Sequence, residues 1–63
     1  ANVYLHVAAE KLNLRSGPGN SYPIIEKLKS AQRLLLINRS GKWAKVKVVS
    51  SSNIGYCSTA YVH

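Results

Sequence analysis

The sequence predicts a small all-β domain, and three observations lead to that class. Apolar and polar residues alternate over several short stretches, which places the apolar side chains on one face of a strand. Gly, Pro, Asn and Ser gather between these stretches, where they favour turns. The 3.6-residue spacing of amphipathic helices is weak by comparison. A chain of 63 residues has room for one small core. We therefore expect a barrel or sandwich of five or six short strands.

The N-terminal half predicts three strands. In residues 3–7 and 11–15 every second residue is aliphatic, so these positions face the core and their neighbours face outward. The inward residues are Val3, Leu5, Val7, Leu12 and Leu14. Pro23 precedes the aliphatic residues 24–28. Because proline lacks an amide hydrogen, we expect that strand to begin there or to lie at an edge of the sheet.

The C-terminal half predicts a mostly buried strand over residues 33–37 that ends at a turn over residues 38–41. A second turn follows at residues 50–53. A short strand over residues 54–57 comes next, and residues 61–62 return to pair with an earlier strand. These elements complete the predicted all-β domain.

The stretch 42–48 shows the cleanest alternation in the chain. Its inward positions are Ala44, Val46 and Val48, and its outward positions are Trp43, Lys45 and Lys47. The outward position of Trp43 has two interpretations. Trp43 would either contact a ligand in a surface groove or plug the open end of a small barrel.

The chain is strongly basic, with nine Lys and Arg residues against Glu10 and Glu26 and a net charge of +7. Such a charge attracts polyanions, including nucleic acid, anionic lipid and wall polymers, or it simply keeps a small domain soluble. One hypothesis is a basic face that binds phosphates or carboxylates, and the other is a solvated strand face. The residues of this predicted face are Arg33, Arg39, Lys42, Lys45 and Lys47.

Nothing in the sequence favours catalysis. Cys57 is the only cysteine, so the chain has no internal disulfide, and the sole candidate pairs would be Cys57 with His6 or His63. Alternation points Cys57 toward the core, where a thiol behaves as a small apolar group. Two histidines far apart in sequence make a poor metal site. We expect no enzyme activity, no metal and no cofactor. No apolar run approaches the length of a membrane span.

Several short motifs occur in a familiar order. Residues 12–19 read LNLRSGPG, and they are followed by aliphatic strands, by Gly41-Lys42-Trp43 leading into Val46, by Gly55-Tyr56 and by Tyr61-Val62. This order resembles the bacterial SH3-like (SH3b) domain family across nearly the whole chain. The resemblance implies a partly open barrel of about five to seven short strands. It also implies a long loop over residues 15–23, which Arg15 can brace through its five donors.

The resemblance also implies a function. Members of this family are non-catalytic modules of exported bacterial proteins, commonly beside wall hydrolases, and they bind peptidoglycan or wall peptides. We therefore expect a targeting module located outside the cell, in the wall or periplasm. Its partners would be peptidoglycan or wall peptides, anionic wall polymers, or the catalytic domain of the same chain. The predicted ligand-binding residues are Asn20, Tyr22, Trp43, Lys45, Tyr56 and Tyr61. Tyr56 and Cys57 stand where the family usually has Trp and an aliphatic residue.

Two other functions stay open at this point. One is a structural domain that packs on its own catalytic neighbour. The other is a basic small barrel that binds nucleic acid by stacking and charge. Residues 1–63 form a single domain in each case. A start at Ala1 and the absence of methionine predict that this domain is a piece of a longer protein.

Overall fold

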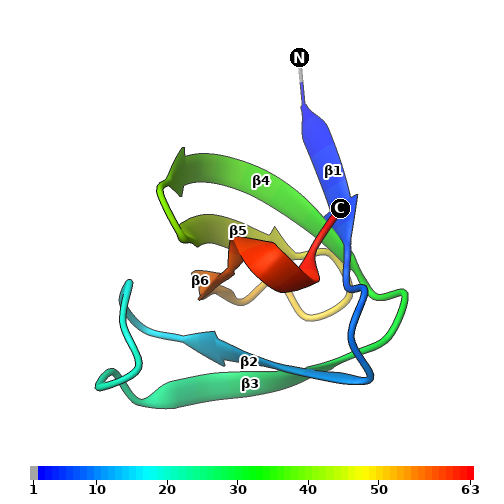
Figure 1. The fold of residues 1–63 in the computed structure, drawn as a ribbon. Coiled ribbons are helices and arrows are strands. Elements are labelled where there is room, and N and C mark those ends of the chain that lie inside the picture. The colour runs from blue at the N-terminus through cyan, green and yellow to red at the C-terminus, as the bar shows by residue number, and fades with distance from the viewer. Residues whose placement is uncertain (1) are drawn as a thin grey trace.

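A computed structural model describes residues 2–63, and these form one antiparallel sheet of six strands (Figure 1). The strands are β1 (Val3–His6), β2 (Lys11–Arg15), β3 (Ile24–Lys29), β4 (Arg33–Ser40), β5 (Trp43–Val48) and β6 (Ile54–Ser58). A short 3₁₀ helix, η1 (Thr59–Tyr61), follows β6. The all-β prediction is confirmed. No helix within residues 2–63 is both long enough and apolar enough to cross a membrane.

The sheet curls into a partly open barrel. Its strand order is β1-β4-β5-β6-β2-β3, so β1 and β3 are the two edge strands. Just after β1 the chain bonds to the turn between β3 and β4, where the Val7 amide donates to the Gln32 carbonyl at 3.0 Å and the Val7 carbonyl accepts from the Ala31 amide at 2.8 Å. Val7 also forms a bridge with Val62, which confirms that residues 61–62 return to an earlier part of the chain.

The core lies inside this curl and follows the predicted alternation. Its buried members are Val7, Leu12, Leu14, Leu28, Leu34, Ala44, Val46, Val48, Cys57 and Val62. Val3 was expected inward but is 52% exposed, and that prediction is wrong. The reason is its place on an edge strand. Val3 has a neighbour only on its β4 side, opposite Leu36, and the start of β1 projects beyond the barrel body (Figure 1).

The strand predicted over residues 33–37 is longer than expected, because β4 continues through Ser40. A bulge between Leu36 and Asn38 leaves Ile37 unpaired and 46% exposed. The prediction of a turn over residues 38–41 is therefore wrong about where the turn begins, because β4 runs through Ser40. The turn occupies only the two residues between Ser40 and Trp43, and Gly41 adopts the left-handed backbone (φ 58°) that such short hairpin turns require.

The loop between β2 and β3 is held from within, as predicted. Nη1 of Arg15 donates to the carbonyl of Asn20 at 3.0 Å and to the carbonyl of Tyr22 at 2.9 Å. The ring of Tyr22 lies directly on Gly17, where any side-chain carbon would come within 2.4 Å of the ring. β3 then begins at Ile24 and forms an edge, so both expectations drawn from Pro23 are confirmed.

Candidate functional site

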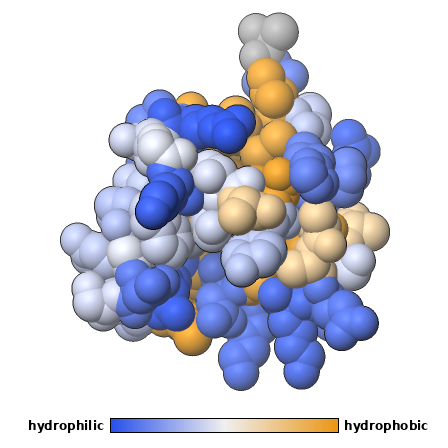
Figure 2. Space-filling view, viewed as in Figure 1, coloured by the Kyte–Doolittle hydropathy of each residue, from blue (hydrophilic) through white to orange (hydrophobic). Residues whose placement is uncertain are grey.

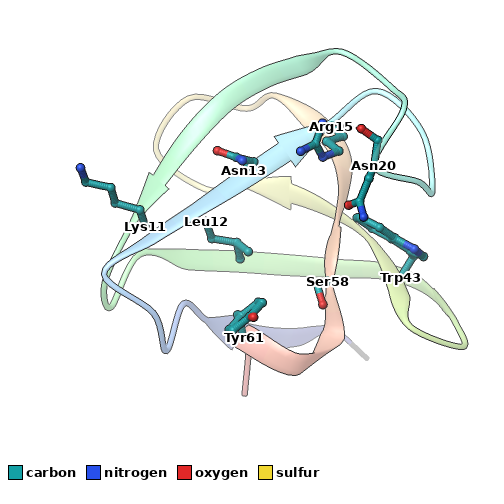
Figure 3. A pocket seen from close by; sticks show the side chains of 8 residues that line it. All are labelled: Lys11, Leu12, Asn13, Arg15, Asn20, Trp43, Ser58 and Tyr61. Atoms are coloured by element: carbon teal, nitrogen blue, oxygen red, sulfur yellow. Dashed lines mark hydrogen bonds between the residues drawn. The ribbon is translucent and has the colours of Figure 1, made fainter.

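A groove of about 360 Å³ lies between β2, β5 and β6, where β2 pairs with β6 only at Arg15 (Figure 3). β2 forms one long side of it, and the β2–β3 loop, β5, β6 and η1 contribute one residue each. The lining residues are Lys11, Leu12, Asn13, Arg15, Asn20, Trp43, Ser58 and Tyr61. A volume near the lower end of the usual range for ligand sites suits a small ligand or a short segment of a polymer.

The alternation of β2 builds the polar side of the groove. Leu12 and Leu14 point into the core, so Lys11, Asn13 and Arg15 stand in a row on the opposite face. Their backbone is fixed on both sides of the strand, by β3 along its whole length and by β6 near Arg15. Three donors therefore line the groove from one rigid strand, and the Lys11 ammonium lies at its far end, directed away from Trp43 (Figure 3).

The two aromatic walls come from the C-terminal half. Trp43 is half-buried at the start of β5, opposite Ser58 of β6. The hydroxyl of Ser58 accepts a hydrogen bond from the Ala60 amide at 3.3 Å, and this cap turns the chain into η1. The turn brings the ring of Tyr61 to the groove, where it stays exposed. The backbone of Tyr61 is anchored by a hydrogen bond of 2.8 Å that its carbonyl accepts from the Ala8 amide.

The groove contains three of the predicted ligand-binding residues, namely Asn20, Trp43 and Tyr61. The other three do not line it. Tyr22 packs on Gly17 in the loop. Tyr56 is half-buried on the outer face of β6, between Lys45 of β5 and Arg15 of β2. Both Tyr56 and Lys45 therefore lie beside the groove.

The polar row of β2 was missed as part of the site. Its signal was present, because Lys11, Asn13 and Arg15 alternate with buried leucines. The sequence could not reveal that this row lies next to Trp43 and Tyr61, since the contact depends on the pairing of β2 with β6 across 41 residues of chain, from Arg15 to Tyr56. Such pairings are not encoded in local patterns.

The groove is positively charged. Of the two acidic residues of the chain, neither lines it. The carboxylate of Glu26 instead accepts hydrogen bonds of 2.7 Å from Ser51 and from Asn53, in the turn between β5 and β6. The hydrogen bond from Ser51, followed by that from Asn53, lowers the pKa of Glu26 below its usual value.

The predicted basic face is not a single surface. Lys45 points outward from β5, but Arg39 pairs with the buried Ala44 and lines a different pocket at the end of the barrel, with Leu5 and His63. Arg39 was expected in a turn, whereas the extension of β4 pairs it with Ala44 and so places it on the opposite face of the sheet from Lys45. Arg33 is engaged elsewhere, with its guanidinium 5.0 Å from the centroid of the Tyr4 ring.

The cysteine lies in the core, as alternation predicted. Cys57 is fully buried, and desolvation raises the pKa of its thiol to about 11. A nucleophilic thiolate is therefore strongly disfavoured. The fold brings His6 and His63 together with ring centroids 6.2 Å apart, which the sequence did not reveal. Across residues 2–63 no three His, Cys, Asp or Glu side chains gather in a way that would hold a metal ion.

Comparison with known proteins places these features in a context. The model of the bacterial SH3 domain family matches residues 10–63. The putative N-acetylmuramoyl-L-alanine amidase YrvJ of Bacillus subtilis (strain 168) is 34% identical over 44 residues, which are 70% of this chain and 8% of YrvJ. The probable cell wall amidase LytH of Staphylococcus aureus is 36% identical over 47 residues, which are 75% of this chain and 16% of LytH. The chain thus spans only a small part of the length of these relatives.

Proposed function

Because the chain belongs to the bacterial SH3 domain family, we propose that it is a non-catalytic module that binds the bacterial cell wall through the groove between β2, β5 and β6. Its ligand would be peptidoglycan or a wall peptide. The module would act outside the cell, in the wall or periplasm, and would hold an attached hydrolase against its substrate. The relatives named as wall amidases support this setting, since the matched segment is a minor part of each.

The observation that carries the proposal is the composition of the groove. Trp43 and Tyr61 offer apolar rings with polar tips, and Asn13, Asn20 and Ser58 offer hydrogen-bonding groups between them. Wall fragments combine sugars and short peptides, which need apolar faces for their rings and methyl groups and polar partners for their amides and hydroxyls. A groove open to solvent also suits a polymer that must enter and leave along its length.

The absence of a reactive group in the groove favours binding over chemistry. The one thiol is sealed in the core, and the acidic residues lie outside the groove. Proton transfer in hydrolysis is usually carried by His, Asp or Glu, or by a metal-bound water. None of those side chains lines this groove among the described residues. The module would therefore contribute affinity, and the chemistry would belong to another part of a longer protein.

Co-sedimentation with purified insoluble peptidoglycan, stripped of anionic polymers, tests the proposal. Trp43→Ala and Tyr61→Ala should each weaken binding, by about thirtyfold if each ring contributes about 2 kcal/mol as a hot-spot residue. Tyr4→Ala is the matched control for Tyr61→Ala, because Tyr4 is a similarly exposed tyrosine on β1 that does not line the groove.

The outcome also separates the other candidate functions. Binding that is equally weakened by Tyr4→Ala, or unaffected by all three substitutions, would refute the groove as the site. Binding to any polyanion, nucleic acid included, that disappears at high salt would indicate a general charge effect. Failure to bind the wall at all would favour a structural domain that docks on its own catalytic neighbour.

A further inference from the structure

We propose that the ligand of this groove carries a free carboxylate, which the β2 side of the groove recognises. The proposal rests on the function proposed above and specifies the chemistry of its ligand. A wall peptide with an ionised terminal or side-chain carboxyl group belongs to this class, whereas a neutral glycan or an amidated peptide does not.

The first support is the unbalanced charge inside the groove. Lys11 and Arg15 line it, and neither glutamate does. Between the two cations Asn13 supplies an amide, which can donate to a carboxylate oxygen. Hydrogen bonds between a cation and a carboxylate are roughly twice as strong as neutral ones. The β2 row therefore offers a carboxylate three donors on one rigid strand.

The second support is the charge on the neighbouring strand. In the register of β2 and β3, Lys11 stands directly opposite Lys29, which lines a neighbouring cavity together with Lys27 and Glu26. Residues directly opposite on adjacent strands point to the same face, and like charges in such positions repel. Hydrophilic side chains accordingly project together over β2 and β3 (Figure 2). A bound anion would relieve this repulsion.

The third support is the way Arg15 is held. Its two hydrogen bonds to the loop, to the carbonyls of Asn20 and Tyr22, both use Nη1. Among the bonds formed within residues 2–63, none uses Nε or Nη2 of Arg15. The loop thus fixes the guanidinium in place and leaves donors on its other edge beside the groove. A preorganised guanidinium loses little rotamer entropy when a carboxylate binds.

The arrangement predicts how the ligand lies. Trp43 closes the groove at one end, and Lys11 stands at the other end of the β2 row (Figure 3). The apolar part of the ligand would cover Trp43 and Tyr61, while its carboxylate would face β2. β2 would then recognise the charge of the ligand, while Trp43 of β5 and Tyr61 of η1 would contact its apolar part.

The test uses a soluble disaccharide-peptide released from peptidoglycan, in two forms. One form keeps its peptide carboxylates, and in the other they are converted to carboxamides of nearly the same size. Binding is followed by the fluorescence of Trp43, the single tryptophan of the chain, and by amide chemical shifts. We expect the carboxamide form to bind about tenfold more weakly, the loss of one charge-assisted hydrogen bond.

Two double variants assign this preference to β2 and β3. Lys11→Gln with Lys29→Gln should reduce the tenfold preference, and Arg15, which stays in place, should keep part of it. Lys42→Gln with Lys47→Gln removes the same charge from the β4–β5 turn and β5, away from β2 and β3, and should keep the preference. Because the first pair relieves repulsion, its thermal stability should equal or exceed that of the parent protein, which separates lost recognition from lost folding.

The possible failures are distinct. If both ligand forms bind with equal affinity at the groove, the carboxylate inference is wrong while the wall-binding function stands. If both double variants lose the preference equally, the effect is net charge and the assignment to β2 and β3 is wrong. If neither ligand form binds, the proposed function and the carboxylate inference fail together.

Discussion

Gly55→Ala should damage both the fold and the groove, because Gly55 of β6 lies in close contact with the backbone of β2. A methyl group at this position would lie 2.6 Å from the carbonyl oxygen of Arg15, 2.8 Å from Cγ of Leu14 and 3.1 Å from Cδ1 of Ile25. The first of these is a backbone atom on β2, so it cannot move aside as the end of a flexible side chain would. β6 must therefore separate from β2.

The expected cost follows from the cost of inserting one carbon into a packed core, about 1–3 kcal/mol. A chain of 63 residues has a total stability of about 3–9 kcal/mol at the usual value per residue. At about 4–8 °C per kcal/mol, a loss of about 2 kcal/mol lowers the melting temperature by roughly 8–16 °C. Gly55→Ala thus removes a large fraction of the stability.

The assay is thermal and urea denaturation followed by circular dichroism. Gly41→Ala is the control, because it places the same methyl group in open space, although at φ 58°. Its cost is the backbone strain of the left-handed region, about 1 kcal/mol. Because Gly41 lies in the β4–β5 turn, that variant should keep its affinity for the ligand.

Affinity supplies an independent readout for Gly55→Ala. The groove spans β2 and β6, so their separation should weaken wall binding even at temperatures where the variant is fully folded. A Gly55→Ala protein within about 0.5 kcal/mol of the parent, the usual range for surface substitutions, would refute the tight β2–β6 contact.

Three further predictions concern single side chains. Arg15→Met should cost about 1 kcal/mol and speed hydrogen exchange in the β2–β3 loop, because two loop carbonyls lose their donor; unchanged exchange would contradict the bracing role. The thiol of Cys57 should resist alkylation at pH 8 in the native protein and react rapidly in denaturant, because burial raises its pKa to about 11. Fast labelling of the native protein would contradict the burial of this thiol. The pKa of Glu26 is lowered in the folded protein, so its contribution to the free energy of unfolding should be complete above the ordinary glutamate pKa of about 4.3 and be lost as the pH falls through the lower folded value. Glu26→Gln should flatten that part of the profile of stability against pH. An unchanged profile would exclude the hydrogen bonds from Ser51 and Asn53.

Local patterns predicted the core well, because alternation determines which side of a strand faces inward. Leu12 and Leu14 and the inward row of β5 are buried as predicted. The errors arose where the regular period breaks. The bulge at Ile37 shifts the register of β4, and an edge position leaves Val3 uncovered. Neither feature has a local signal comparable to Gly41 at the turn or Pro23 before β3.

The site was only partly predictable for a different reason. Trp43 and Tyr61 were selected because exposed aromatic side chains are suited to binding, and both line the groove. The polar row of β2 joins them through strand order alone, since β2 pairs with β6, far away in sequence. The same order places Tyr56 opposite Arg15, beside the groove but not in its lining. Which residues bind a ligand stays a prediction.

Binding of cell-wall fragments in the groove between β2, β5 and β6 can be measured by an amide-shift titration of the isotopically labelled domain with soluble muropeptides, at low and at high salt. The prediction is a set of saturable shifts that survive high salt and cluster at Asn13, Asn20, Trp43 and Tyr61. Shifts spread over the lysines and erased by salt, or no shifts in either condition, would contradict it.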